Sequence, residues 1–101
     1  MAKSKRSRDP GRAASAPSAV AFSRRAWEDY QHWVQNDRTV ARRIARLIEE
    51  CLRHPFRGAG NPEPLRHELA GYWSRRITRE HRLVYCVTDG RCEIAQCRYH
   101  Y

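Results

Sequence analysis

The spacing of apolar residues changes once along the chain, at the segment FRGAGNPEPL (residues 56–65). Two glycines and two prolines among its ten residues predict a loop. Before this segment, apolar residues recur at three- and four-residue spacing, as on the face of a helix. After it, they alternate with a period of two, as on a strand. Helices followed by strands are typical of an α+β domain.

The clearest single element is a helix that should run from about residue 38 to the residue before Pro55, which ends it. Asp37 is a suitable N-cap for this helix. An earlier helix should begin at Arg24 and break at residues 36–37, with one aromatic face. The apolar face of the later helix is Val40, Ile44, Leu47, Ile48, Cys51 and Leu52; that of the earlier helix is Trp27, Tyr30, Trp33 and Val34.

The second half of the chain should form a small twisted antiparallel sheet. The runs GYWSRRIT (71–78), HRLVYCV (81–87) and the last residues alternate, and Asp89-Gly90 in TDGR is the usual sign of a hairpin turn. Residues 20–22 would join this sheet as a short first strand. Both helices should pack on one face of the sheet. We therefore predict an α+β fold with two N-terminal helices on one side of the sheet.

The final run is expected to be a strand as far as the end of the chain. In it, Ala95, Cys97 and Tyr99 alternate with Gln96, Arg98 and His100. The sheet face turned away from the helices would then carry a cationic surface on neighbouring strands. Its members would be Arg76, Arg82, Arg98 and His100.

The charge of the chain favours an anionic partner. With 20 Lys and Arg against 11 Asp and Glu, the 101 residues carry a formal charge of +9. Nucleic acid is the simplest such partner, because neutralising phosphates releases condensed counterions. A merely soluble surface with non-specific affinity is the alternative. Charge alone does not separate these two interpretations.

Residues 1–19 are expected to be a basic, disordered leader, and residues 20–101 the folded domain. The leader contains five basic residues, one acid and no large apolar side chain apart from Met1, so it cannot bury enough surface to fold. If the native protein started at Val20, the leader would be absent from it; the N-terminal mass of the native protein tests this.

The four cysteines, Cys51, Cys86, Cys92 and Cys97, have neither CxxC nor zinc-finger spacing. We expect buried, reduced thiols and no metal or other cofactor. No apolar run approaches the roughly 20 residues that a membrane span needs. These features together favour a cytoplasmic protein that does not enter a membrane.

Three residues would suit the cleavage of RNA without a metal ion. Such cleavage needs a base for the 2′-hydroxyl proton, a cation for the charge on phosphorus, and an acid for the departing 5′-oxygen. Glu63, Arg82 and His100 offer these groups. Each also has an ordinary alternative: an exposed loop acid, an ion-paired strand arginine and a terminal polar residue.

The stretch HPFRGAGNPEPLRHELAGYWSRRITREHRLVYCVTDG, followed by AQCRYHY, closely resembles the YoeB (Txe/YoeB) family of the RelE/ParE superfamily of bacterial toxins. The segment FSRRAWEDYQHWVQNDRTVARRIARLIEE belongs to the same resemblance, which spans residues 20–101. The segments PEPL, GYWSRRIT, EHRLVY and CRYHY in this order are highly specific. The basic leader has no counterpart in the family pattern.

The resemblance implies a RelE-like microbial RNase fold and a ribosome-dependent endoribonuclease that uses no metal. Such toxins cut mRNA in the ribosomal A site and leave a 2′,3′-cyclic phosphate and a 5′-hydroxyl. By motif match, Glu63 is the general base, Arg82 the transition-state arginine and His100 the general acid. The supporting and RNA-binding residues would be Arg66, Arg76, Arg98 and Tyr101. The implied partners are a YefM-like antitoxin, the 70S ribosome with its mRNA, and a second copy of the chain.

Two other function classes fit the same fold. One is a non-enzymatic poison like the ParE branch, which acts by binding gyrase. The other is a plain RNA-binding module with a cationic sheet. Neither needs the set of Glu63, Arg82 and His100, so this set favours the nuclease.

Overall fold

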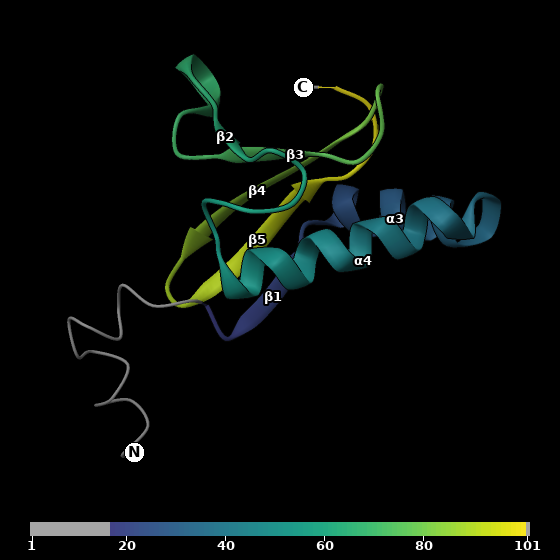
Figure 1. The fold of residues 1–101 in the computed structure, drawn as a ribbon, viewed down its shortest axis with the longest axis horizontal. Coiled ribbons are helices and arrows are strands. Elements are labelled where there is room, and N and C mark those ends of the chain that lie inside the picture. Colours follow the sequence, from purple (N-terminus) through teal and green to yellow (C-terminus); the bar gives the residue numbers. More distant parts are fainter. Residues whose placement is uncertain (1–16, 101) are drawn as a thin grey trace.

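The computed structural model describes residues 17–100, and these form two helices and a five-stranded sheet (Figure 1). The α+β fold is therefore confirmed. Residues 1–16 of the predicted leader, and Tyr101, lie outside the described residues. The elements in chain order are β1 (Ala19–Phe22), α3 (Arg24–Asn36), α4 (Arg38–Arg53), β2 (Glu63–Pro64), the 3₁₀ helix η1 (His67–Leu69), β3 (Trp73–Arg76), β4 (Arg82–Thr88) and β5 (Arg91–Gln96).

The strand order in the sheet is β1-β5-β4-β3-β2. The pairs β5–β4, β4–β3 and β3–β2 are antiparallel, as predicted, but β1 runs parallel to β5. The prediction of an entirely antiparallel sheet was therefore wrong at this edge. Parallel neighbours need a long crossover connection, and the helices that follow β1 begin that connection.

The first strand begins slightly earlier than the sequence indicated. It starts at Ala19, and the Ser18 N–H donates a hydrogen bond of 3.0 Å to the carbonyl of Gly90. Ser18 and Ala19, which we assigned to the leader, therefore lie against the sheet.

The loop prediction for residues 56–65 was wrong at Glu63 and Pro64. These residues form the short edge strand β2, in which Glu63 pairs with Ser74 and Pro64 with Trp73 of β3. A proline is tolerated here because an edge strand has one side without a ladder partner. The pairing fixes the backbone of Glu63 relative to β3.

Both helices cover the same face of the sheet, and the core lies between them and the sheet (Figure 1). The apolar stripe of α4 is confirmed: Ile44, Leu47 and Cys51 are fully buried. The predicted cap is also confirmed, since the Asp37 carboxylate accepts a hydrogen bond from Val40 N–H. The described part of the chain has no helix long and apolar enough to cross a bilayer. All four cysteines are unpaired thiols.

The buried face of α3 is rotated from the predicted one. Trp33 is buried, but Trp27 is 49% exposed and packs edge-on against Phe22. The residues that face the core with Trp33 are Ala26 and Asp29, seven and four positions earlier. The spacing of the aromatic residues led us to place Trp27 on the buried face of the helix and to miss the buried Asp29.

The end of the chain is not a strand. β5 stops at Gln96, and residues 97–100 follow as irregular backbone, with Tyr99 in the left-handed region at φ 65°. The predicted alternation of the last residues was therefore wrong, and His100 does not sit on a sheet position. We call residues 97–100 the C-terminal tail.

Candidate active site

A hollow of about 220 Å³ lies where β2, β3, β4 and the C-terminal tail meet. Four of the residues predicted for the site line it, from four different parts of the fold. It is lined by Gly60, Asn61, Glu63, Ser74, Arg76, Arg82 and His100. We call this hollow the catalytic pocket.

Strand register explains why distant residues meet in the catalytic pocket. Glu63 lies opposite Ser74, and Arg76 lies opposite Arg82. Because Ser74 and Arg76 are two positions apart on β3, all four side chains leave the same sheet face. From strand geometry, the α-carbons of Glu63 and Arg82 are about 12 Å apart. Long Glu and Arg side chains can close this span around a phosphodiester.

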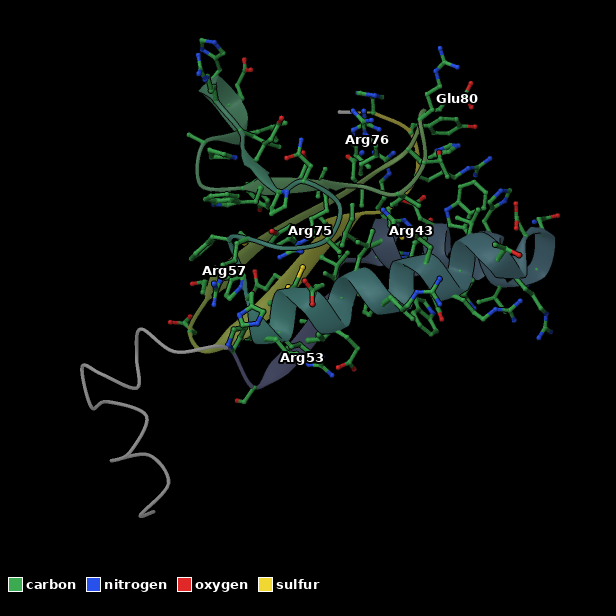
Figure 2. All side chains as sticks on the ribbon, viewed as in Figure 1. Arg43, Arg53, Arg57, Arg75, Arg76 and Glu80 are labelled. Carbon is green, nitrogen blue, oxygen red and sulfur yellow. The ribbon has the colours of Figure 1, made fainter. Side chains whose placement is uncertain are left out.

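Two arginines that line the catalytic pocket occupy directly opposed positions of neighbouring strands. Arg76 and Arg82 are paired positions on β3 and β4, and like charges so placed repel. The three ion pairs among the described residues all lie outside the catalytic pocket. Figure 2 shows Arg76 at the end of the sheet near the C-terminus. The arrangement is suited to binding an anion between the two guanidinium groups.

The guanidinium of Arg82 is held by the turn that precedes β4. Its Nη1 donates to three carbonyl oxygens, those of Thr78 (2.9 Å), Arg79 (3.2 Å) and His81 (3.1 Å). One edge of the group is thereby fixed to the backbone. The cation is preorganised, so it needs little rearrangement to meet a developing negative charge.

The C-terminal tail is held in place by side chains of α3. The Trp33 indole N–H donates to the carbonyl of Cys97 (2.9 Å), and the Cys97 N–H donates to the carboxylate of Asp29 (3.0 Å). Arg25 pairs with Asp29 across 3.5 Å. These contacts replace the strand pairing that we had predicted for the tail. They fix the chain three residues before His100.

Replacing Trp33 with Phe is expected to lower the free energy of unfolding by about 1 kcal/mol, because the buried carbonyl of Cys97 loses its donor. Urea denaturation measures this change. Trp27→Phe is the matched control, since Trp27 is half exposed, and should change stability by less than about 0.5 kcal/mol. Equal effects of the two substitutions would show that the bond to Cys97 contributes nothing.

Arg75, next to Arg76 on β3, is fully buried and was missed by the sequence analysis. Its guanidinium donates to the carbonyls of Ala59 (2.7 Å), His54 (2.6 Å) and Arg57 (3.0 Å), and to the hydroxyl of Tyr85 (3.1 Å). In Figure 2, Arg76 lies near the C-terminus and Arg75 lies nearer to α4. Arg75 therefore fixes the segment of residues 54–59, which leads to the wall of the catalytic pocket.

Gly60 lets this segment pass close to the sheet. It has φ 82°, and a Cβ at this position would lie 3.0 Å from the side chain of Leu47 and 3.0 Å from that of Arg75. Just before it, the Ala59 N–H donates to Glu50 of α4 at 3.0 Å. This bond is the main reason that the pKa of Glu50 is lowered. Contacts on both sides thus fix the wall of the pocket.

Two predicted supporting residues, Arg66 and Arg98, do not line the catalytic pocket. Arg66 is exposed at the start of η1, and Arg98 lies over the ring of Tyr99, 4.8 Å from its centroid. Tyr101 lies outside the described residues. No signal in the sequence distinguished Arg98 from His100, because both were assigned to one strand face.

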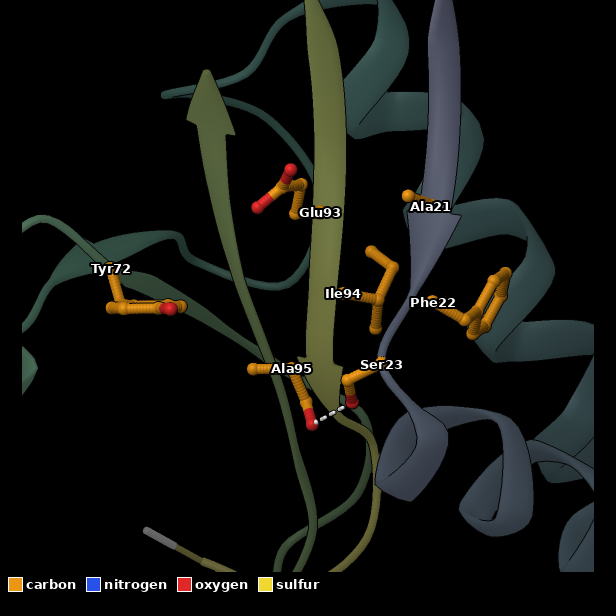
Figure 3. A pocket seen from close by; sticks show the side chains of 7 residues that line it. All are labelled: Ala21, Phe22, Ser23, Tyr72, Glu93, Ile94 and Ala95. Carbon is orange, nitrogen blue, oxygen red and sulfur yellow. Dashed lines mark hydrogen bonds between the residues drawn. The ribbon is translucent and has the colours of Figure 1, made fainter. Parts of the chain in front are cut away.

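A second hollow, of about 230 Å³, lies over β1 and β5 (Figure 3). Ser23, which lines it, donates to the carbonyl of Ala95 (2.8 Å), and Glu93 is paired with Arg91 at 2.6 Å. Of the described residues that line this hollow, none is an arginine or a histidine, whereas the catalytic pocket has both. Among residues 17–100, no cluster of three or more His, Cys, Asp or Glu could hold a metal ion.

Comparisons with known proteins show the family of this chain. Residues 22–101 match the family described as YoeB-like toxin of bacterial type II toxin-antitoxin system. The chain is 54% identical to Toxin YoeB of Escherichia coli (strain K12) over 82 residues, which are 81% of this chain and 98% of that protein.

Solved structures from Staphylococcus aureus are similar as well. The YoeB dimer superposes with a TM-score of 0.79 at 45% identity, covering 85% of this chain and 100% of that one. The toxin of a heterotetrameric YoeB-YefM toxin-antitoxin complex superposes with a TM-score of 0.77 at 45% identity and the same coverage.

Proposed function

Because this chain belongs to the family of YoeB-like toxins of bacterial type II toxin-antitoxin systems, we propose that it is a ribosome-dependent endoribonuclease. It cuts mRNA in the ribosomal A site and thereby inhibits translation. The reaction is an acid–base transesterification that uses no metal. Its products are a 2′,3′-cyclic phosphate and a 5′-hydroxyl.

One observation carries this proposal: the pair of arginines facing each other beside a carboxylate and an imidazole. Arg76 and Arg82 are opposed across β3 and β4, and Glu63 and His100 line the same pocket. A binding surface for RNA needs the cations alone. A base and an acid placed beside them supply what phosphodiester cleavage requires in addition.

In the proposed mechanism, the Glu63 carboxylate takes the proton of a 2′-hydroxyl. The 2′-oxygen then attacks phosphorus, and the bond from phosphorus to the 5′-oxygen breaks. Arg82, with Arg76 opposite it, stabilises the charge that develops on the phosphoryl oxygens. His100 gives its proton to the departing 5′-oxygen, so that a 5′-hydroxyl leaves.

Further residues would bind the message rather than react with it. Arg66 and Arg98 are cations that do not line the catalytic pocket, and Tyr101 would help to shape the site. Arginine suits this role because its planar group binds phosphate in a bidentate way and stacks on bases. We propose these three as RNA-binding residues.

We also propose protein partners. The net charge of +9 suits an antitoxin with an acidic, disordered segment that folds onto the basic surface and covers the catalytic pocket. The similar Staphylococcus aureus toxin is found with YefM in one structure and as a dimer in another. A YefM-like antitoxin and a second copy of this chain are therefore the expected partners, in the cytoplasm, where ribosomes translate.

Induced expression in bacteria tests the function class. We expect growth to stop within minutes, with cellular mRNA cut at discrete positions and plasmid supercoiling unchanged. Northern blots and primer extension report the cuts, and agarose gels report the supercoiling. Growth arrest with intact mRNA and altered supercoiling would instead identify a gyrase poison. Intact mRNA with no change in supercoiling would leave only an RNA-binding module.

A further inference from the structure

His81 lies between two parts of the candidate site that the proposed mechanism uses. It is the last residue of the turn before β4, next to Arg82, and its ring packs beside the C-terminal tail. The ring is half-buried. It meets Trp33 edge-on at 4.8 Å and Tyr99 at 5.3 Å between centroids.

The hydrogen bond made by the His81 ring defines its protonation state. The backbone N–H of Tyr99 donates to Nδ1 of His81 at 2.6 Å. A backbone N–H can only donate, so Nδ1 must carry a lone pair, and the proton of the neutral ring must be on Nε2. A doubly protonated ring could not accept this bond.

Tyr99 needs such a partner. Its backbone is in the left-handed region at φ 65°, which is uncommon for a bulky residue and persists where surrounding contacts enforce it. Two bonds hold it: its N–H to His81, and its carbonyl accepting from the Arg82 N–H at 3.1 Å. The next residue is His100. The turn that orients Arg82 thus also orients the backbone of His100.

We propose that neutral His81 is a positioning residue that places His100 in the catalytic pocket, and that protonation of His81 releases the C-terminal tail. The inference rests on the proposed function for the role of His100. The hydrogen bond to Tyr99 does not depend on that function. Acidification therefore breaks the hydrogen bond between Tyr99 and His81, releases the tail and lowers the rate of cleavage.

The surroundings of His81 keep it neutral near pH 7. Its pKa lies below the ordinary value, chiefly because the ring is buried. Glu80 opposes this shift in the pKa, and Arg98, His32 and Arg82 add to it. Because folding lowers this pKa, the stabilisation is fully present above about pH 6.5 and is lost as the pH falls below that value.

Two substitutions of His81 separate the hydrogen bond from the titration. His81→Asn keeps an acceptor oxygen near the place of Nδ1 and cannot titrate. His81→Leu keeps apolar bulk beside Trp33 and has no acceptor. The matched control is His32→Asn, which removes a neighbouring imidazole that packs on the same Trp33 ring at 4.9 Å.

The first measurement is hydrogen exchange of the Tyr99 amide by NMR in the full chain, with each rate divided by the intrinsic exchange rate at that pH. We expect protection of about tenfold or more at pH 7.5 that is lost at pH 5 in wild type and in His32→Asn. His81→Asn should be protected at both pH values, and His81→Leu at neither. Protection that does not change with pH in wild type, or that survives in His81→Leu, would overturn the proposal.

The second measurement is single-turnover cleavage of ribosome-bound mRNA at pH 7.5. His81→Leu should be slower than wild type by about tenfold or more, and His81→Asn should be within about threefold of wild type. Cleavage by His81→Leu at the wild-type rate would overturn the positioning role. Absence of cleavage by wild type itself would refute the proposed nuclease, while the exchange measurement still decides whether His81 holds the tail.

Discussion

Replacing His100 with Gln, or Glu63 with Gln, is expected to slow the cleavage of ribosome-bound mRNA by about 10²–10⁴-fold for each substitution. Gln has the length of Glu and can hydrogen bond, but it neither takes nor gives a proton at the reacting oxygens. Both positions are exposed at the catalytic pocket, so stability should change by less than about 0.5 kcal/mol. Single-turnover rates at saturating toxin concentration measure the effect on the chemical step.

Matched controls exist for both substitutions. Glu68→Gln alters an exposed glutamate of η1, and His54→Gln alters an exposed histidine at the end of α4; neither residue lines the catalytic pocket. These variants should cleave within about threefold of wild type. Comparable losses in the controls and in the pocket variants would remove the reason for assigning acid–base roles to Glu63 and His100.

Replacing Arg75 with Met is expected to lower the free energy of unfolding by about 3 kcal/mol or more. The substitution leaves the carbonyls of His54, Arg57 and Ala59 without their buried donor, and the Tyr85 hydroxyl loses its contact with the guanidinium. Arg75→Lys should recover part of the loss, because an ammonium can donate to some of these groups but cannot reproduce the planar fork.

Urea denaturation of each variant measures the Arg75 effect. Arg53→Met is the control, because Arg53 is exposed in the last turn of α4 (Figure 2), and it should shift stability by less than about 0.5 kcal/mol. A loss below about 1 kcal/mol in Arg75→Met would mean that water replaces the guanidinium at those carbonyls. The segment of residues 54–59 would then be held by other contacts.

Local features of the fold were predictable because neighbouring residues determine them. The stripe of α4, the Asp37 cap and the Asp89-Gly90 turn all follow from residues within a few positions of one another. In the turn, Asp89 and Gly90 both have positive φ, as this type of hairpin requires.

The errors occurred where long-range contacts decide the structure. The tail alternates like a strand, yet Cys97 donates to the Asp29 carboxylate and accepts from the Trp33 indole, so it bonds to α3 instead of continuing β5. The sequence also cannot distinguish Arg75 from Arg76. One is buried because loop carbonyls far along the chain satisfy its guanidinium, and the other is exposed in the catalytic pocket.

The residues of the candidate site were found by resemblance, and the structure adds their placement. It brings Glu63, Arg76, Arg82 and His100 around one hollow and leaves Arg66 and Arg98 outside it. The unexpected strand β2 explains how Glu63 comes to face Arg82, because pairing with β3 fixes its register. The chemical roles of these residues stay predictions.

The central claim is that the catalytic pocket cuts mRNA on the ribosome. The most direct test incubates the purified full chain with ribosomes stalled on a defined mRNA and maps both new ends, with ribosome-free mRNA and the Glu63→Gln variant in parallel. The account predicts a cut within the A-site codon only when ribosomes are present, a 2′,3′-cyclic phosphate and a 5′-hydroxyl at the new ends, and almost no product from the variant. Intact mRNA with wild-type protein, or equal cutting by Glu63→Gln, would contradict it.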